Sequence, residues 1–305
     1  MGTAYVDCGW RRAVGGTALG ALVVLSVAGC GMTAAERALR HAPGNAFGLL
    51  HVECERVRDA VLDKLGEGKT APAESLAALR WLASKIDHVD IFFVPKGDGS
   101  AGPLVVLHGF LSRPDVERFV SRLAEPAKLR SKGNGRYVVG EHGDAARFVF
   151  GDEANDVRRG VTLIAPQRIL TDALIGSLGK RRNRTLVKLL KHADTSKPIW
   201  GACEAPPGEK DGPRFVAGWL EPRGEGAGEM KAVFASEQEA VKGKRELTED
   251  VPKDIARLLR ATRQGSTVTL TFTKPFEALR EPIGMLLGAL AGEAKPVRSK
   301  EEELR

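Results

Sequence analysis

The residue with the clearest chemical setting in this chain is a cysteine close to the N-terminus. Cys30 directly follows an uncharged, mostly apolar segment, residues 13–28, which is itself preceded by Arg11 and Arg12. A positive start, an apolar stretch and small residues before a cleavage point make up the pattern of an export signal. The pattern therefore predicts that this chain is exported.

The residues around the cysteine narrow the type of export. The ending Val27-Ala28-Gly29-Cys30 resembles the lipobox of bacterial lipoproteins, and the resemblance is confined to this N-terminal segment. It implies that the signal, residues 1–29, is cut off, that a lipid is attached to the Cys30 thiol and that the new N-terminus is acylated. The lipid on Cys30 would join the protein to a membrane on its extracytoplasmic side.

The residue after Cys30 indicates the membrane to which the lipid anchor would attach the protein. Gly31 stands where an aspartate would signal inner-membrane retention in Gram-negative lipoproteins, so the resemblance implies the periplasmic side of the outer membrane if the source has two membranes. Two alternatives stay open. Val27 and Gly29 also satisfy an ordinary signal peptidase, and a retained anchor would need about 20 apolar residues to cross a bilayer.

The remaining cysteines raise the question of a disulfide. Cys8 would leave with the signal, so Cys54 and Cys203 are the two whose state matters. Export brings them to an oxidising compartment, where a bridge between them is one interpretation. Burial of each as a small apolar side chain is the other.

One segment resembles part of a hydrolase site. His108-Gly109-Phe110 follows an apolar strand and resembles the strand-then-His-Gly segment of the α/β-hydrolases. That family also needs a Gly-x-Ser-x-Gly elbow downstream. Ser177 and Ser100 each lack one of the glycines, so no catalytic motif is predicted.

Metal sites find little support in the spacing. The acidic segments 141–144 and 152–156 have oxygen ligands of the kind that Ca²⁺ prefers, but polar turns explain them equally well. The six histidines are scattered, and no paired cysteine pattern accompanies them. We therefore predict no metal site and no cofactor.

The net charge is +7, and the densest run of basic residues lies at positions 180–184. Export argues against nucleic acid as the partner. Contact with anionic lipid or an envelope protein, or a solvated loop between two helices, are the interpretations that remain. The residues concerned are Lys180, Arg181, Arg182 and Arg184.

The periodicity of the mature chain predicts an α+β fold. Val268, Leu270 and Phe272 alternate with threonines, which indicates a strand with one buried and one wet face, as antiparallel sheets allow. Glycine-rich turns predict hairpins, and Ser112 with Asp115 predicts a capped helix. We expect an antiparallel sheet with helices packed on one face.

The order of these elements suggests an internal duplication of a ββαβ unit. The predicted organisation is a signal (1–29), a lipidated tether (30–44), two α+β units (45–195 and 196–292) and a charged tail (293–305).

These observations favour a lipid-anchored extracytoplasmic protein that binds or scaffolds without catalysis. A solute-binding lipoprotein with two lobes around a cleft is one alternative, and an envelope serine hydrolase with a Ser-His-acid site is another. A concave polar pocket, and its position relative to the two halves, would discriminate between them.

Overall fold

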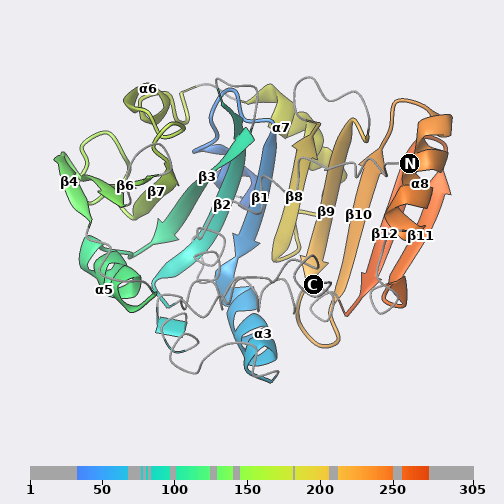
Figure 1. Cartoon of the computed structure of the whole chain (residues 1–305), viewed down its shortest axis with the longest axis horizontal. Coiled ribbons are helices and arrows are strands. Elements are labelled where there is room, and N and C mark those ends of the chain that lie inside the picture. Colours follow the sequence, from blue (N-terminus) through green and yellow to red (C-terminus); the bar gives the residue numbers. More distant parts are fainter. Residues whose placement is uncertain are drawn as a thin grey trace, which may run out of the picture.

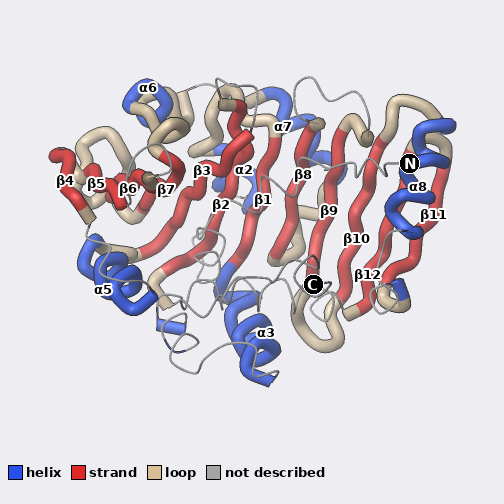
Figure 2. Tube along the Cα trace, in the orientation of Figure 1, coloured by secondary structure: helices blue, strands red, loops and turns tan. Residues whose placement is uncertain are grey.

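The fold is built on one continuous antiparallel sheet of 12 strands (Figures 1 and 2). The computed structural model describes residues 33–67, 77, 80–81, 84–96, 101–123, 129–139, 145–180, 183–205, 212–249 and 256–274. From edge to edge the strands are β11 (Leu259–Gln264), β12 (Thr267–Thr273), β10 (Ala227–Val233), β9 (Phe215–Glu221), β8 (Ile199–Glu204), β1 (Gly48–Glu53), β2 (Ile86–Pro95), β3 (Ala101–Gly109), β7 (Val161–Pro166), β6 (Ala146–Phe150), β5 (Arg136–Val139) and β4 (Arg130–Gly133).

Helices cover both sides of this sheet. Successive side chains of a strand point to opposite faces of the sheet. Val105 and Val106 of β3 therefore belong to two different hydrophobic cores, one on each face. We call the side of Val105 the α3 face and the side of Val106 the α2 face. The α3 face carries α3 (Cys54–Glu67), α5 (Arg113–Leu123) and α8 (Glu237–Glu249), and the α2 face carries α2 (Ala34–Leu39), α6 (Asp172–Ile175), α7 (Arg184–Leu189) and the 3-10 turn η3 (Leu190–His192).

The α+β class with an antiparallel sheet is thus confirmed. The helices, however, lie on both faces of the sheet, whereas we expected them on one face. The capped helix is also confirmed: the Ser112 and Asp115 side chains bond each other's backbone N–H at the start of α5.

The two predicted α+β units meet through their first strands. β1 and β8 pair antiparallel, with Leu49 opposite Ala202 and His51 opposite Trp200. On each side of this junction the next two strands form a hairpin, a helix comes after it, and the last strand of the half returns beside the hairpin, as β7 beside β3 and β12 beside β10. The first half adds α3, β4 and β5, which have no counterpart among the described residues of the second. The element order therefore agrees with a duplicated unit, and both units share one sheet.

The folded body begins earlier than the predicted tether allows. Thr33 caps α2 and forms a capping box with Glu36. Ala38 and Ala42 are fully buried in the core of the α2 face. Residues from Thr33 onward are therefore part of the folded body. Within the described part of the chain, helices are too short or too polar to cross a bilayer.

The junction strand gives a direct test of this core. Leu49 of β1 is 1% exposed, so Leu49→Ala should lower the free energy of unfolding by about 2–5 kcal/mol through lost burial and a cavity. Urea denaturation measures the change. Val241→Ala on α8, where the side chain is 54% exposed, is the control and should change it by less than about 0.5 kcal/mol. Equal effects of the two substitutions would contradict the described core.

Candidate functional site

Polar side chains gather on the α2 face where β1, β2 and β3 lie side by side. His88 and Asp90 alternate along β2 and so share a face, and the strand register places His51 opposite Asp90 and His108 opposite His88. Asp90 and His51 are fully buried. The sequence contained a signal that we missed, namely one histidine in each of three largely apolar strands, with Asp90 in the middle strand.

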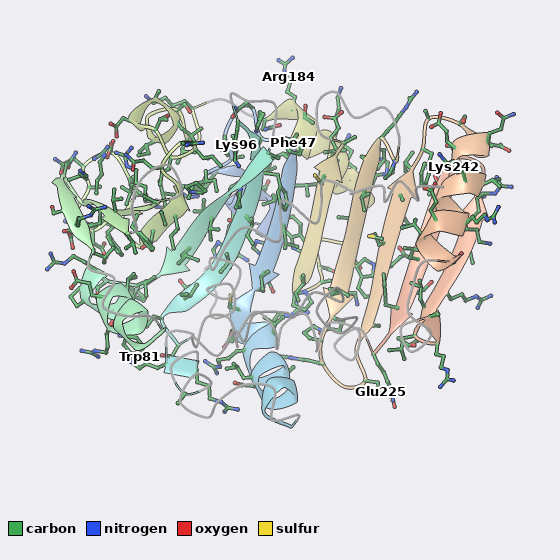
Figure 3. All side chains as sticks on the ribbon, viewed as in Figure 1. Phe47, Trp81, Lys96, Arg184, Glu225 and Lys242 are labelled. Carbon is green, nitrogen blue, oxygen red and sulfur yellow. The ribbon has the colours of Figure 1, made fainter. Side chains whose placement is uncertain are left out.

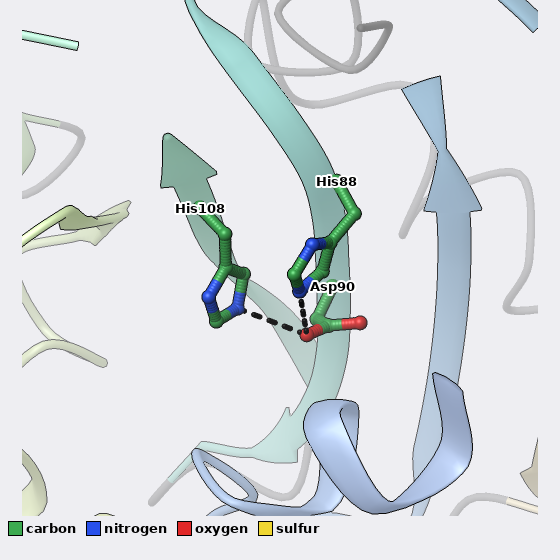
Figure 4. Close-up of side chains that lie close together, drawn as sticks. All are labelled: His88, Asp90 and His108. Atoms are coloured by element: carbon green, nitrogen blue, oxygen red, sulfur yellow. Dashed lines mark hydrogen bonds and ion pairs between the residues drawn. The ribbon is translucent and has the colours of Figure 1, made fainter. Parts of the chain in front are cut away.

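Asp90 is the centre of this cluster. Its Oδ1 lies 2.6 Å from His51 Nδ1, and its Oδ2 lies 3.1 Å from His108 Nε2 and 4.0 Å from His88 Nε2. Figure 4 shows His88 and Asp90 on one strand and His108 on its neighbour, with both rings turned to the carboxylate. A buried carboxylate is costly unless paired and hydrogen-bonded, and these contacts meet that requirement.

Ring contacts extend the cluster in two directions. The rings of His88 and His108 stack with centroids 4.0 Å apart, and His41, after α2, meets His108 edge-on at 4.9 Å. On the other side His51 stacks on Trp200 of β8 at 4.6 Å. Four of the six histidines are thereby brought together from positions up to 67 residues apart (108 − 41 = 67).

The environment sets the charge of these groups. Burial alone would raise the pKa of Asp90, but His51 and His108 hold that pKa well below its usual range, so the carboxylate is ionised. Burial, reinforced by His108, lowers the pKa of His41 to about 4 and that of His88 to about 3. Both imidazoles are therefore neutral at pH 7 and have a nitrogen lone pair available.

A polar cavity opens beside the cluster. It has a volume of about 560 Å³, and we call it the cationic pocket because arginines outnumber acids in its lining. Its lining comes only from residues 37–161, so the pocket lies within the first half and not between the halves. The lining residues that carry its chemistry are Arg37, Arg40, Arg158 and Arg159, His41, His88 and His108, and Asp87 and Asp152.

A second cavity, of about 280 Å³, lies over the middle strands and has an almost wholly apolar lining. Gly201 and Gly218 face each other across β8 and β9 there. A side chain at either glycine would collide with the neighbouring strand, since an added Cβ would lie 2.7 Å or 2.5 Å from a backbone oxygen. This cavity lacks the convergent polar groups that fix a ligand's orientation, so the cationic pocket is the better candidate.

Of the two interpretations of Cys54 and Cys203, a disulfide or separate burial, the structure does not have the disulfide. The two sulfur atoms are not bonded to each other. Cys203 pairs with Gly48 at one end of β1, whereas Cys54 follows the other end, roughly 20 Å away at about 3.3 Å per residue. A bridge needs Cα atoms within about 7 Å, so geometry excludes the disulfide interpretation. Burial raises the pKa of the Cys203 thiol to about 12.

The other predicted sites divide between described and undescribed residues. Cys30, Arg181 and Arg182 lie outside the described residues, as do 141–144, Ser100 and the tail 293–305. Lys180 and Arg184 are exposed, and Figure 3 shows Arg184 pointing away from the sheet. Arg184 lies on the outside of α7, whose Leu186 and Leu189 are buried.

Two motifs acquire structural roles in place of chemical ones. In the acidic segment 152–156, Asp156 pairs with Arg136, Glu153 accepts from the Tyr137 hydroxyl, and Asp152 accepts from the Gly160 N–H. The Ser177 hydroxyl donates to the Leu174 carbonyl. The segment that resembles a hydrolase, His108-Gly109-Phe110, lies at the end of β3. Its His108 belongs to the Asp90 cluster.

Comparison with known proteins adds little. The sequence matches no protein-family model and no curated protein. The solved structure of TP0453, in crystal form I, resembles this chain with a TM-score of 0.45 and 7% identity, covering 83% of this chain and 96% of TP0453. A similarity at that level carries no argument about function, so the functional case rests on the site.

The depressed histidine pKa values predict how stability depends on pH. In the unfolded chain histidine has a pKa of about 6.5, whereas in the fold the pKa is about 4 for His41 and about 3 for His88. Between pH 6.5 and pH 4, therefore, these two histidines are protonated in the unfolded chain but not in the folded protein. The free energy of unfolding should therefore fall as pH is lowered from 6.5 toward 4, by up to about 1.4 kcal/mol per pH unit for each histidine. Asp90, with a depressed pKa, adds to the loss only below about pH 4.

Urea denaturation at pH 7, 6 and 5 in EDTA measures this slope. The double variant His41→Gln/His88→Gln should flatten it. The variant of an exposed histidine outside the cluster, His192→Gln, should keep it. An unchanged slope in the double variant would show that other groups cause the pH dependence.

Proposed function

We propose that this protein is a lipid-anchored, extracytoplasmic binding protein whose ligand is a small anion that bears phosphate or carboxylate groups. The observation that carries the proposal is the cationic pocket, a 560 Å³ cavity with four arginines, three histidines and two aspartates in its lining. Guanidinium groups bind phosphate and carboxylate through charge-assisted, often bidentate hydrogen bonds.

The contacts of the lining residues leave part of this charge available to a ligand. Arg37 of α2 pairs with Glu53 at 3.6 Å, which holds that side of the pocket in place. Arg40, Arg158 and Arg159 are exposed on its rim. A preformed site with exposed cations at its mouth suits a ligand that arrives from solution.

The position of the pocket also fits the predicted anchor. Arg37 and Arg40 lie in and directly after α2, which begins next to Thr33. If Cys30 carries lipid, the three residues from Cys30 to Thr33 span at most about 11 Å. The anchor would then hold the α2 end of the fold close to the membrane surface.

Among the alternatives, the fold favours neither a two-lobed binder nor a hydrolase. A single sheet runs through both halves, and the pocket lies within one of them. The histidine that resembled the hydrolase segment contacts an aspartate in the same cluster. We therefore place binding, not acyl transfer, at this site.

Anion binding is tested with inorganic phosphate and citrate in EDTA, with sodium chloride at equal ionic strength as the blank. We expect both anions to bind, and Arg158→Ala/Arg159→Ala to weaken them at least about tenfold, since each charged hydrogen bond contributes about 1.5–3 kcal/mol. The control Arg184→Ala/Lys188→Ala removes the same charge from α7 and should leave binding unchanged. Equal weakening by both pairs would indicate general electrostatics and contradict a built pocket.

Anchoring is tested separately with Cys30→Ser. If the thiol carries lipid, the variant should lose its hydrophobic partitioning into detergent and its cleavage before residue 30. Cys203→Ser, which alters a thiol within the fold, is the matched control and should partition as the unaltered protein does. A Cys30→Ser protein that is processed and partitioned normally would rule out the lipoprotein assignment.

A further inference from the structure

The donor atoms of His88, Asp90 and His108 lie close together beside the cationic pocket. One ligand atom from each residue lies within 4.8 Å of the others. The separations from Asp90 Oδ2 are 3.1 Å to His108 Nε2 and 4.0 Å to His88 Nε2. Donor atoms around a tetrahedral zinc ion are about 3.3 Å apart, given metal–ligand distances of about 2.0–2.2 Å.

We propose that His88, Asp90 and His108 form a binding site for one divalent transition-metal ion, with zinc as the best fit. Two imidazole nitrogens and one carboxylate oxygen are a donor set that suits zinc and its neighbours, whereas calcium and magnesium prefer oxygen alone. Three protein ligands leave one position of a tetrahedral ion open. The site goes beyond the proposed anion binding and does not depend on it.

The surroundings of Asp90 support a ligand role for one of its two oxygens. His51, fully buried, takes Oδ1 at 2.6 Å and fixes the carboxylate in one orientation. Oδ2 is thereby directed at the two pocket histidines. A second residue that holds a ligating carboxylate in this way is a regular feature of metal sites.

His88 supplies an independent observation. Its Nε2 is buried, and within the described part of the chain it has no hydrogen-bond partner. A buried polar atom without a partner is unfavourable by about 1–3 kcal/mol, so its retention needs an explanation. A metal ion between His88, Asp90 and His108 would satisfy this nitrogen and replace the hydrogen bond between the other two.

Access and charge are compatible with an ion at this point. His88 and His108 line the cationic pocket, so the open coordination position would face solvent through that cavity. The arginines of the rim disfavour a bare cation, but the Asp90 carboxylate and the rim acids Asp87 and Asp152 oppose them. An anion in the pocket would then be held by both the ion and the arginines.

The experiment uses the full chain, purified in detergent without a histidine tag and stripped with EDTA. Titration with Co²⁺ should give d–d absorption between about 500 and 700 nm that is typical of four-coordinate sites, and Zn²⁺ should displace it with one ion per chain. Calorimetry with Zn²⁺ gives the affinity. X-ray absorption of the zinc-loaded protein should show two imidazoles among the ligands.

Variants test the residues. His88→Gln and His108→Gln should each weaken zinc binding at least about 100-fold, and His51→Gln, which removes only the residue that orients Asp90, by about 10–100-fold. His192→Gln is the control, because this exposed histidine lies outside the cluster. Circular dichroism checks the fold of every variant.

Several results would overturn the proposal. One such result is that zinc does not bind, or that more than one zinc ion binds per chain with equal affinity. Another is that His88→Gln and His108→Gln both bind zinc as the unaltered protein does. Either result would mean that the cluster is a charge network without a metal. Should the variants fail to fold, a zinc spectrum of the unaltered protein without imidazole ligands would do the same. Anion binding, measured in EDTA, fails or succeeds separately.

Discussion

The pairing of β1 with β8 is the interaction on which the rest of the structure depends. It joins the first strands of two similar halves, so that a 12-stranded sheet replaces two smaller ones. Each half would otherwise expose a row of unpaired N–H and C=O groups along its first strand. The pairing also covers β1 on both sides, which makes it an interior strand. Interior position is what allows His51 and Leu49 of β1 to be buried so completely.

A buried strand can hold a charge only if a neighbour supplies its partner. Asp90 of β2 is fully buried, and its partner His51 comes from β1 at the position directly opposite. Trp200 of β8, opposite His51 on the other side, closes the row and excludes water from it. Removing one member would leave an uncompensated charge, which is much more costly than replacing the whole group by apolar residues. This fully buried charge, held among apolar side chains of β1 and β2, is the reason we propose a role in binding for it.

The helices decide what reaches this row from solution. On the α3 face, α3 and α5 cover the corresponding part of the sheet with apolar side chains. On the α2 face the covering helix is short, and α2 with the two residues after it contributes Arg37, Arg40 and His41 at the edge of a cavity. The row of His51, Asp90 and His108 lies on the α2 face, beside the cationic pocket. The two proposed ligands, an anion and a metal ion, share this opening, and the predicted lipid anchor joins the chain just before α2.

Features set by neighbouring residues could be predicted from the sequence alone. The alternation at Val268, Leu270 and Phe272, the Ser112–Asp115 cap and the glycine-rich hairpins all depend on a few adjacent positions, and each was confirmed. The export pattern at Cys30 is equally local. The cluster of His51, Asp90 and His108 was not predictable in this way, because periodicity does not specify which strands pair or in which register. Only the packing of segments far apart in the chain brought the histidines together, and the same packing separated Cys54 from Cys203.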